Sequence, residues 1–395
     1  MIRPRVLCLD IEGGHGGSSR SLYQSLAHLS KSGADVEVWC RRSGIIQSLY
    51  ANCDIPCNVM PAMQHVSSLP RLSRNLYVYS RAYLKFPASR AFRSELSAVV
   101  NERFDIVHFN HEALFLLARW LRSRTRASFT MHIRTCPAPT VFSRWQARTI
   151  NRTVDNSVFI TENEKSFWRA LGYDPVDGRV IYNIAGTSPV TVKTHPSIPG
   201  DRRLKVASLC NFAWIRGVDR FVDIAASLAE RGRRDILFVM AGDMRLHGSL
   251  PGELGVLSRK GATLKEYAAA RGVADMFLFL GHVSEPERVL AGCDALARLS
   301  REDNPWGRDV IEGLGAGRPV IATGSYDRFV ESDATGILLP TFSADALADN
   351  ILRLADDRAL AARLGAAAQA RIESLCNGPA RAADLAAVWR DVARK

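Results

Sequence analysis

The chain has 395 residues, of which 47% are hydrophobic and 23% are charged, the composition of an ordinary globular protein. Its length exceeds the size at which one hydrophobic core stops growing, so we expect two domains. No apolar run approaches the ~20 residues that span a bilayer, and the net charge of +12 leaves nucleic acid, an anionic membrane and an acidic substrate as candidate partners.

The N-terminal half predicts a parallel sheet whose strands are connected by helices. Its first apolar run, RVLCLDI, soon meets acid and glycine, which indicates a buried strand rather than a secretory signal. Strand-like runs then alternate with amphipathic runs of ~10–15 residues, the pattern of βαβ units. The predicted strands are 5–11, 35–40, 105–109, 127–133, 157–161 and 179–183, and the predicted helices are 21–33, 114–123 and 164–172.

A basic and aromatic segment, residues 69–96, interrupts this alternation. Six arginines and lysines there are opposed by one acid, and five tyrosines and phenylalanines are interleaved with them on helix-like spacing. Such a segment suits a surface that meets anionic lipid headgroups. The alternative is a solvated helical face that packs on its own domain. We therefore expect a cytoplasmic protein, soluble or peripheral on the inner face of the membrane.

The alternation restarts after a stretch with three prolines and no helical period, for which we predict a linker over 188–203. An amphipathic segment, 376–395, ends the chain. The predicted architecture is α/β: two Rossmann-like domains, 1–187 and 204–375, face each other across a cleft, and the C-terminal helix packs back on the first. The strand-like runs of the second domain are 204–209, 236–243, 276–281, 295–300 and 318–323.

Open parallel sheets bind ligands at the carboxyl ends of their strands, so the loops there are the candidate site. The first such loop, EGGHGGSSR, has four glycines before a helix. Backbone amides at Gly16 and Gly17 can approach a phosphate closely, and the helix dipole favours an anion. A tight turn without a ligand explains the same residues. His108, His111 and His132 also stand at or after strand ends, and we select His132 as the one that meets the substrate.

In the second domain, Arg216 follows the strand at 204–209, where a cation can clamp a diphosphate. A surface arginine is the alternative. His282 and Val283 end the strand at 276–281 and leave backbone groups that can recognise a base edge.

The stretch NPWGRDVIEGLGAGRPVIA covers residues 304–322 and places Glu312 after a polar loop. We predict a helix from Val310, with Glu312 in its first turn. Its carboxylate either stabilises the helix N-terminus or accepts two sugar hydroxyls. Asn304, eight residues earlier, offers a donor and an acceptor without charge.

With these motifs in this order, the chain resembles the retaining glycosyltransferases of family 4, which have the GT-B fold. The resemblance covers nearly the whole chain and is strongest from Asn211 to Pro340, where SREDNPWGRDVIEGLGAGRPVIAT is similar to the donor-site signature. It implies that Glu312 binds the ribose of a nucleotide and that His132 reaches the transferred sugar. It further implies that the loop before Glu312 faces the donor sugar and phosphates, that His282 and Val283 contact the base, and that Gly16 and Gly17 lie beside the diphosphate. The loop residues are Pro305, Trp306, Gly307 and Arg308.

Two positions depart from the family pattern. Asn304 stands where the family has the first glutamate of its E-x7-E element, and Asn211 stands where it has the arginine of an arginine–lysine diphosphate pair. Arg216 replaces the lysine and can clamp a diphosphate through its planar fork. The cation lost at Asn211 weakens donor binding unless Arg308 or Arg20 supplies one. These departures leave the identity of the transferred sugar undetermined, whereas they bear less on the class of reaction.

The implied reaction moves a sugar from a nucleoside diphosphate sugar, which we expect to be a UDP-sugar, to a hydroxyl of a glycan or lipid-linked saccharide, with retention. Negative charge builds on the departing diphosphate, so stabilisation by amides and cations is the main requirement. We assign Arg216, Asn304 and His132 to the reacting centre and expect no metal, no cofactor and no nucleic-acid partner. Two alternatives stay open: a sugar-nucleotide epimerase of this architecture, and a non-catalytic basic protein that binds nucleic acid or regulates a pathway on a degenerate glycosyltransferase fold.

Overall fold

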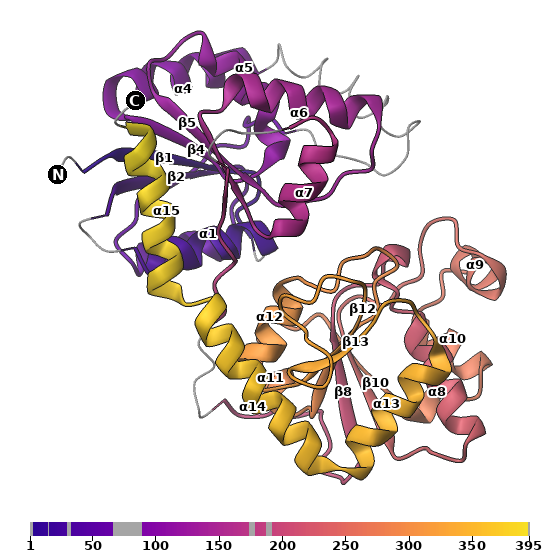
Figure 1. The fold of residues 1–395 in the computed structure, drawn as a ribbon. Helices are drawn as coiled ribbons and strands as arrows, with labels where there is room; N and C mark the ends of the chain where they lie inside the picture. Colours follow the sequence, from indigo (N-terminus) through magenta and orange to yellow (C-terminus); the bar gives the residue numbers. More distant parts are fainter. Residues whose placement is uncertain are drawn as a thin grey trace. The chain divides into compact units, whose positions relative to one another are not determined.

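The computed structural model describes residues 3–14, 16–29, 33–65, 89–173, 178–186 and 192–393. The chain forms two compact α/β units: unit 1 comprises Met1–Ile184 and Cys376–Lys395, and unit 2 comprises Ala185–Leu375 (Figure 1). The predicted α/β fold with two parallel sheets is confirmed. Most of the basic segment 69–96 lies outside the described residues. No helix in the described ranges is long and apolar enough to cross a membrane.

Unit 1 contains a seven-stranded parallel sheet in the order β3-β2-β1-β4-β5-β6-β7. Successive side chains of a strand point to opposite faces, so Val6 and Cys8 of β1 enter one core layer and Leu7 and Leu9 the other. Helices cover both layers, which explains why β1 is apolar from Val6 to Leu9. The strands are β1 Arg5–Asp10, β2 Asp35–Cys40, β3 Cys57–Val59, β4 Ile106–Phe109, β5 Ser128–Ile133, β6 Asn156–Phe159 and β7 Arg179–Val180.

The helices of unit 1 each bury one face, and in α4 that face is mainly apolar. In α4, Phe92, Leu96 and Val100 recur every four residues and are buried. The end of the basic segment therefore packs on its own domain, as the alternative reading of the sequence expected. The helical elements are α1 Gly17–Ala27, α2 Ile46–Ala51, α4 Arg90–Arg103, η2 Glu112–Leu114, α5 Phe115–Arg122, α6 Val141–Thr153, α7 Glu162–Ala170 and α15 Gly378–Ala393.

The C-terminal helix α15 belongs to unit 1, as the sequence predicted. It lies against α1, β4 and β5 (Figure 1). Leu385, Val388, Trp389 and Val392 of α15 are buried in the same core layer as Val6. The first and the last parts of the chain thus share one hydrophobic core.

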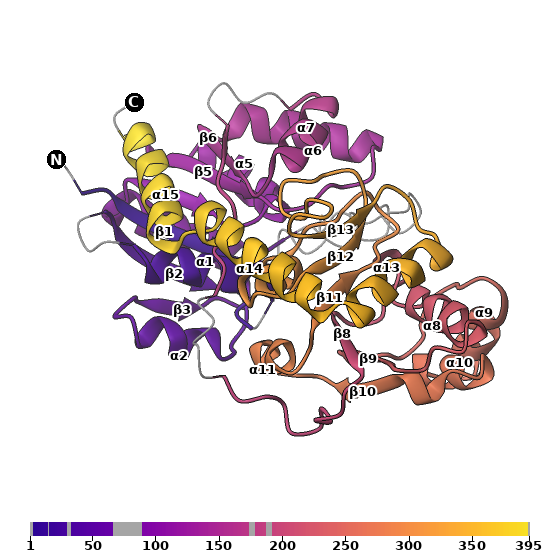
Figure 2. The same cartoon turned by 60° about the horizontal axis from the view of Figure 1, so that its bottom comes forward.

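Unit 2 contains a six-stranded parallel sheet in the order β10-β9-β8-β11-β12-β13, and α13 lies beside α8 on it (Figure 2). Residues 192–203, predicted as linker, pack on this unit: the His195 N–H donates to the Arg288 carbonyl (3.0 Å) and Ile198 is buried. The strands are β8 Leu204–Leu209, β9 Ile236–Ala241, β10 Phe277–Gly281, β11 Ala295–Arg298, β12 Val320–Thr323 and β13 Gly336–Leu339. The helical elements are η3 Trp214–Arg216, α8 Arg220–Glu230, α9 Gly252–Arg259, α10 Leu264–Ala270, η4 Ala274–Met276, α11 Pro286–Ala291, α12 Arg308–Gly315, α13 Ala344–Asp356 and α14 Arg358–Leu375.

Candidate functional site

The candidate donor site of unit 2 lies where the strand order reverses. β8 and β11 are neighbours in the sheet, but the chain continues from β8 toward β9 and from β11 toward β12. Loops that leave such a pair of strands diverge and open a crevice at the carboxyl edge. The loop after β8 carries Arg216, and the loop after β11 carries Asn304 and leads to Glu312. The fold therefore brings these predicted residues to one edge of the sheet.

A buried ion pair fastens the two loops to each other. The Arg301 guanidinium donates to both carboxylate oxygens of Asp219 (2.7 and 2.5 Å) and to the Trp214 carbonyl (2.7 Å), and it stacks on the Trp214 ring (3.3 Å). The Arg301 N–H also donates to the Ile215 carbonyl (2.9 Å). These contacts fix η3 from both sides, so Arg216 at its end is held at a defined place while its side chain stays exposed.

A second buried ion pair supports the loop before α12. Arg298 donates to Asp309 (2.8 Å to each oxygen), with both side chains about nine-tenths buried. The same guanidinium donates to the Asn304 backbone carbonyl (2.9 Å) and approaches its side-chain oxygen (3.4 Å). Gly307 has φ +156°, and a Cβ there would lie 2.6 Å from an Asp309 oxygen. The loop's course thus depends on a glycine at 307 and on a cation beneath it.

Asn304 stands among charged neighbours although it is itself neutral. Partial burial raises the pKa of the nearby Glu302 carboxyl above its ordinary value, while the positive charges of Arg216 and Arg298 act in the opposite direction. Glu302 therefore brings a carboxylate close to Arg216, two residues before the position where the family pattern has its first glutamate.

Glu312 lies in the second turn of α12, so the predicted helix start at Val310 was wrong. The helix begins at Arg308 because Gly307 caps it, and Asp309 is the acid of the first turn. One Glu312 oxygen accepts a hydrogen bond from Arg308 (2.9 Å), and each side chain is 13% exposed. The Arg308 guanidinium is therefore engaged with Glu312. In this arrangement it does not stand apart as a replacement for the diphosphate-binding cation that is absent at Asn211.

Asn211 connects two loops of unit 2. Its side-chain oxygen accepts from the Asp243 N–H (2.8 Å), which joins the loop after β8 to the loop after β9. Trp306 is buried and packs edge-on against Tyr326 (ring centroids 5.1 Å apart), so its side chain supports the loop from inside. His282 is exposed and Val283 is half-buried directly after β10, at the same edge of the sheet.

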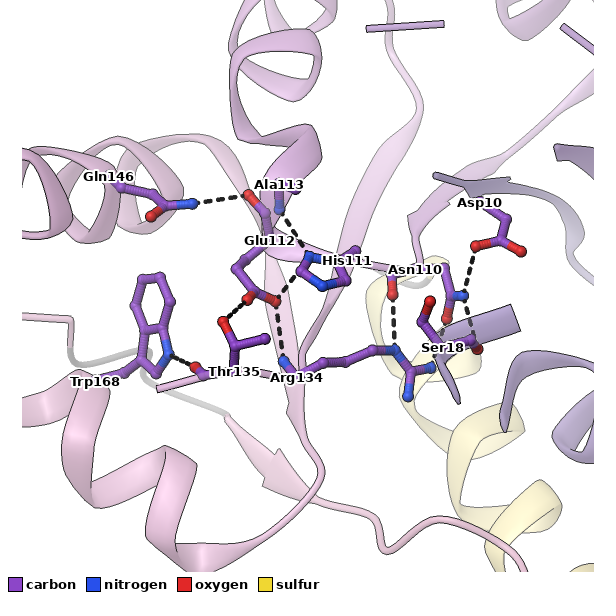
Figure 3. Close-up of polar contacts among 10 residues, drawn as sticks. All are labelled: Asp10, Ser18, Asn110, His111, Glu112, Ala113, Arg134, Thr135, Gln146 and Trp168. Atoms are coloured by element: carbon purple, nitrogen blue, oxygen red, sulfur yellow. Dashed lines mark hydrogen bonds and ion pairs between the residues drawn. The ribbon is translucent and has the colours of Figure 1, made fainter. Parts of the chain in front are cut away.

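Unit 1 has a polar cluster at its own strand-order reversal, between β1 and β4 (Figure 3). Asp10 ends β1 and Asn110 follows β4, and both are fully buried. Ser19 donates to Asp10 (2.5 Å), and the Asn110 amide donates to Asp10 (3.1 Å) and to the Ser18 carbonyl (3.1 Å). The cluster fixes the start of α1 against the ends of two strands.

Arg134 and Glu112 extend this cluster across β5 (Figure 3). Arg134 donates to the Asn110 carbonyl (2.8 Å) and to its side-chain oxygen (2.5 Å). The buried Glu112 accepts from the Arg134 N–H (2.9 Å) and from the Thr135 hydroxyl, and it pairs with His111 (3.2 Å). Arg134 is thus a connecting residue rather than an exposed cation.

His132, the predicted contact of the transferred sugar, belongs to a row of buried rings. Its Nδ1 lies 2.8 Å from Nε2 of His108, whose Nδ1 lies 2.8 Å from the Thr130 hydroxyl and 3.4 Å from Nε1 of Trp389. Burial lowers the pKa of His108 to about 3 and that of His132 well below its ordinary value, and the Arg134 charge lowers both further. Both imidazoles are therefore neutral at pH 7.

The glycine-rich loop is shaped by its own neighbours. Gly16 caps α1, and a Cβ at Gly16 would lie 1.4 Å from a Glu12 carboxylate oxygen. At Gly13, with φ +153°, a Cβ would lie 1.7 Å from the Arg42 carbonyl. The tight turn therefore accounts for Gly13 without a ligand, whereas at Gly16 the contact is with the end of a flexible side chain and does not by itself require a glycine. Gly17, the first residue of α1, is exposed. Among the residues described, no group of three or more His, Cys, Asp or Glu side chains could hold a metal ion.

Five residues of these clusters were not selected from the sequence. Each is a charged or amide residue inside or directly after an apolar strand, a position where such a residue must be paired. That pattern is visible in RVLCLD, DIVHFNHE and ALARLSRED, so it was an available signal. The residues are Asp10, Asn110, Glu112, Arg298 and Arg301.

Two family models match the chain, one on each half. The model described as Glycosyltransferase Family 4 matches residues 15–187, and the model described as Glycosyl transferases group 1 matches residues 196–371. Together the two matches cover most of the chain, and the chain is a family 4-like glycosyltransferase with the GT-B fold.

A curated relative and several solved structures are similar to the chain. The alpha-D-kanosaminyltransferase of Streptomyces kanamyceticus is 28% identical over 182 residues, which is 45% of this chain and 43% of that relative. Anabaena HepE, solved in complex with UDP-glucose, is 18% identical with a TM-score of 0.75 over 98% of this chain and all of its own. A glycosyltransferase from Rickettsia africae is 16% identical with a TM-score of 0.72 over 99% of each chain. At these identities the solved structures establish the shared fold.

Proposed function

We propose that the protein transfers a sugar from a UDP-sugar to a hydroxyl of a glycan or lipid-linked saccharide, with retention at the anomeric carbon and without a metal. The observation that carries the proposal is the arrangement at the β8–β11 edge of unit 2. There an exposed cation, Arg216, ends η3 and the partly buried carboxylate of Glu312 stands on α12, and two buried ion pairs fix the loops that lead to them. The solved structure of HepE with UDP-glucose supports the choice of uridine.

The donor would be held at two points of opposite charge. The Glu312 oxygens accept hydrogen bonds, so they suit the two ribose hydroxyls and not a phosphate. Arg216 and the N–H groups at the start of α12 suit the diphosphate, whose negative charge grows as the sugar leaves. His132 of unit 1 is assigned to the transferred sugar and Asn304 to its hydroxyls. The donor's own leaving phosphate accepts the acceptor's proton, so no protein nucleophile is needed.

The experiment that tests the donor site is calorimetric titration with UDP, GDP and ADP. We expect UDP to bind with micromolar affinity and Glu312→Ala to remove most of that binding. Glu253→Ala is the matched control, because Glu253 is an exposed glutamate in the first turn of another helix of unit 2. Equal binding by both variants and the unchanged protein would disprove the ribose role. No binding of any nucleotide by the folded protein would favour the non-catalytic alternative.

The finer parts of the proposal need separate measurements. Incubation with UDP-sugars and saccharide acceptors, followed by NMR of the product before it equilibrates, reports the anomeric configuration; an inverted product would contradict retention. Turnover that stops with EDTA and returns with Mg²⁺ would contradict metal independence. Co-sedimentation with anionic and neutral vesicles tests the membrane role of segment 69–96, and equal recovery with both would contradict it.

A further inference from the structure

The hydrogen bonds along the row of rings in unit 1 run in one direction, from donor to acceptor, and Trp389 on α15 is the residue that sets this direction. A neutral imidazole carries one proton, so one of its nitrogens donates and the other accepts. The His108–His132 contact at 2.8 Å therefore requires that one ring donates and the other accepts. The two possible directions place the outer proton of His132 on different nitrogens.

The Thr130 hydroxyl, at one end of the row, does not determine which of the two hydrogen-bond directions is present. The Thr130 hydroxyl lies 2.8 Å from Nδ1 of His108 and can either donate or accept, because it rotates. The indole N–H of Trp389, in contrast, only donates. It lies 3.4 Å from the same Nδ1, and its ring meets the His108 ring edge-on with centroids 5.5 Å apart.

We infer that Trp389 is a positioning residue that keeps the proton of His132 on Nε2. A donor at Nδ1 of His108 makes that nitrogen the acceptor, so His108 carries its proton on Nε2 and donates it to Nδ1 of His132. His132 then carries its own proton on Nε2. Within the described part of the chain, the hydrogen bond of the His132 side chain is the one at Nδ1.

Burial makes this direction persistent. His108 and Trp389 are fully buried, and His132 is 4% exposed, so water does not compete for these nitrogens. The low pKa values of both histidines keep the rings neutral at pH 7, which preserves the single-proton condition. The opposite direction would leave the Trp389 N–H facing another N–H in an apolar layer, and an unsatisfied buried donor is costly.

The direction decides what His132 can do, a consequence that rests on the proposed function. With the proton on Nε2, the histidine donates a hydrogen bond to a sugar oxygen and cannot remove a proton from a hydroxyl at that atom. His132 would therefore orient the transferred sugar rather than act as a base. The C-terminal helix would contribute to the reaction through a residue that never touches the substrate.

Long-range ¹H–¹⁵N correlation spectra of the protein labelled at histidine test the inference without any turnover. The His132 signals are assigned by their loss in His132→Gln. We expect the unchanged protein to show a protonated Nε2 and a bare Nδ1 for His132 at pH 7. A protonated Nδ1 in the unchanged protein would overturn the inference before any other variant is made.

Trp389→Phe keeps an aromatic ring and removes the N–H. We expect the ratio of the two His132 tautomers to move toward Nδ1–H by about fivefold, the equivalent of about 1 kcal/mol for one neutral hydrogen bond. Trp168→Phe is the matched control, because Trp168 is also fully buried in unit 1 and its N–H donates to a backbone carbonyl (Thr135, 2.8 Å) outside the row. Equal tautomer ratios in the two variants would overturn the assignment.

A further variant covers the case in which Trp389→Phe does not fold. Thr130→Val removes the ambiguous hydroxyl and keeps the side-chain shape, so Trp389 alone would set the direction. We expect His132 to keep its proton on Nε2 in this variant. A change to Nδ1–H would mean that Thr130 sets the direction instead. Failure of UDP binding would leave these spectra interpretable, so this inference and the proposed function fail separately.

Discussion

Gly217 offers a sharp test of how the donor loop is built. Its φ is +65°, a left-handed conformation that costs an alanine about 1–2 kcal/mol. A Cβ at Gly217 would also lie 1.8 Å from the Leu299 carbonyl oxygen, so the loop after β8 would have to move away from the loop after β11. That carbonyl accepts a hydrogen bond from Arg220 (3.0 Å), a charged bond whose loss costs about 1.5–3 kcal/mol.

The two effects predict that Gly217→Ala destabilises unit 2 by about 3 kcal/mol or more. For a unit of 150–250 residues this lowers Tm by about 6–12 °C. Gly232→Ala is the matched control, because Gly232 has φ +73° in the same unit and a Cβ added there would meet nothing within 4 Å. It should lose only the left-handed cost of about 1–2 kcal/mol, or about 2–8 °C.

The assay is thermal unfolding followed by circular dichroism, with UDP titration of both variants below their Tm. Gly217→Ala should also bind UDP more weakly, because the displaced loop carries Arg216, whereas Gly232→Ala should bind it unchanged. Equal losses of Tm in the two variants would refute the reasoning, since they would show that the contact with Leu299 carries no energy.

Three further predictions concern charged groups. Arg216→Ala should weaken UDP binding about tenfold, the loss of about 1.5 kcal/mol for a charged hydrogen bond, with Tm unchanged; the exposed Arg234→Ala is the control, and equal titrations would contradict the diphosphate role. Glu112→Gln should lower the Tm of unit 1 by about 4–8 °C, because the amide cannot accept from both of the carboxylate's donors and about 2 kcal/mol is lost; thermal unfolding measures it, and an unchanged Tm would be contrary to the buried network. His108 has a native pKa of about 3 against ~6.5 in the unfolded chain, so below pH ~6.5 the unfolded chain binds one more proton and the free energy of unfolding falls by up to about 1.4 kcal/mol for each pH unit of acidification. Urea unfolding between pH 6.5 and 5 measures this dependence of stability on pH, and His108→Gln should reduce it. An unreduced dependence would mean that another group titrates.

The alternation of apolar runs was enough to predict the fold. The strand runs were apolar on both faces, and the runs between them had a helical period, which leaves a doubly wound sheet as the main solution. The C-terminal helix was recognisable as amphipathic, and its apolar stripe, including Trp389, is buried in unit 1. The short elements were not predicted: β3 has three residues and α2 has six, too few to display a period.

The site residues could be predicted from the sequence to the extent that the ends of the strands could be located. Arg216 was found because it follows a strand, and Glu312 because a carboxylate stands where a polar loop becomes a helix; the sheet order brings the loops that lead to both residues to one edge. The pairings were not predictable, because Arg301 meets Asp219 from 82 residues away and Arg298 meets Asp309 through a turn that only Gly307 permits. The start of α12 was also misplaced, because its N-cap residue is Gly307, which has no side chain that would mark a helix start in the sequence.

The return of α15 to unit 1 also affects how the protein is made. Unit 1 is interrupted after Ile184 and resumes at Cys376, so the ribosome synthesises all of unit 2 before α15 appears. At about 5–20 residues per second this takes roughly 10–40 s, during which the apolar layer that α15 completes, built from residues of α1, β1, β2 and β4, stays uncovered on the nascent chain. Chaperone supply and elongation speed, more than the equilibrium stability of the finished molecule, should therefore govern how much folded protein a cell obtains.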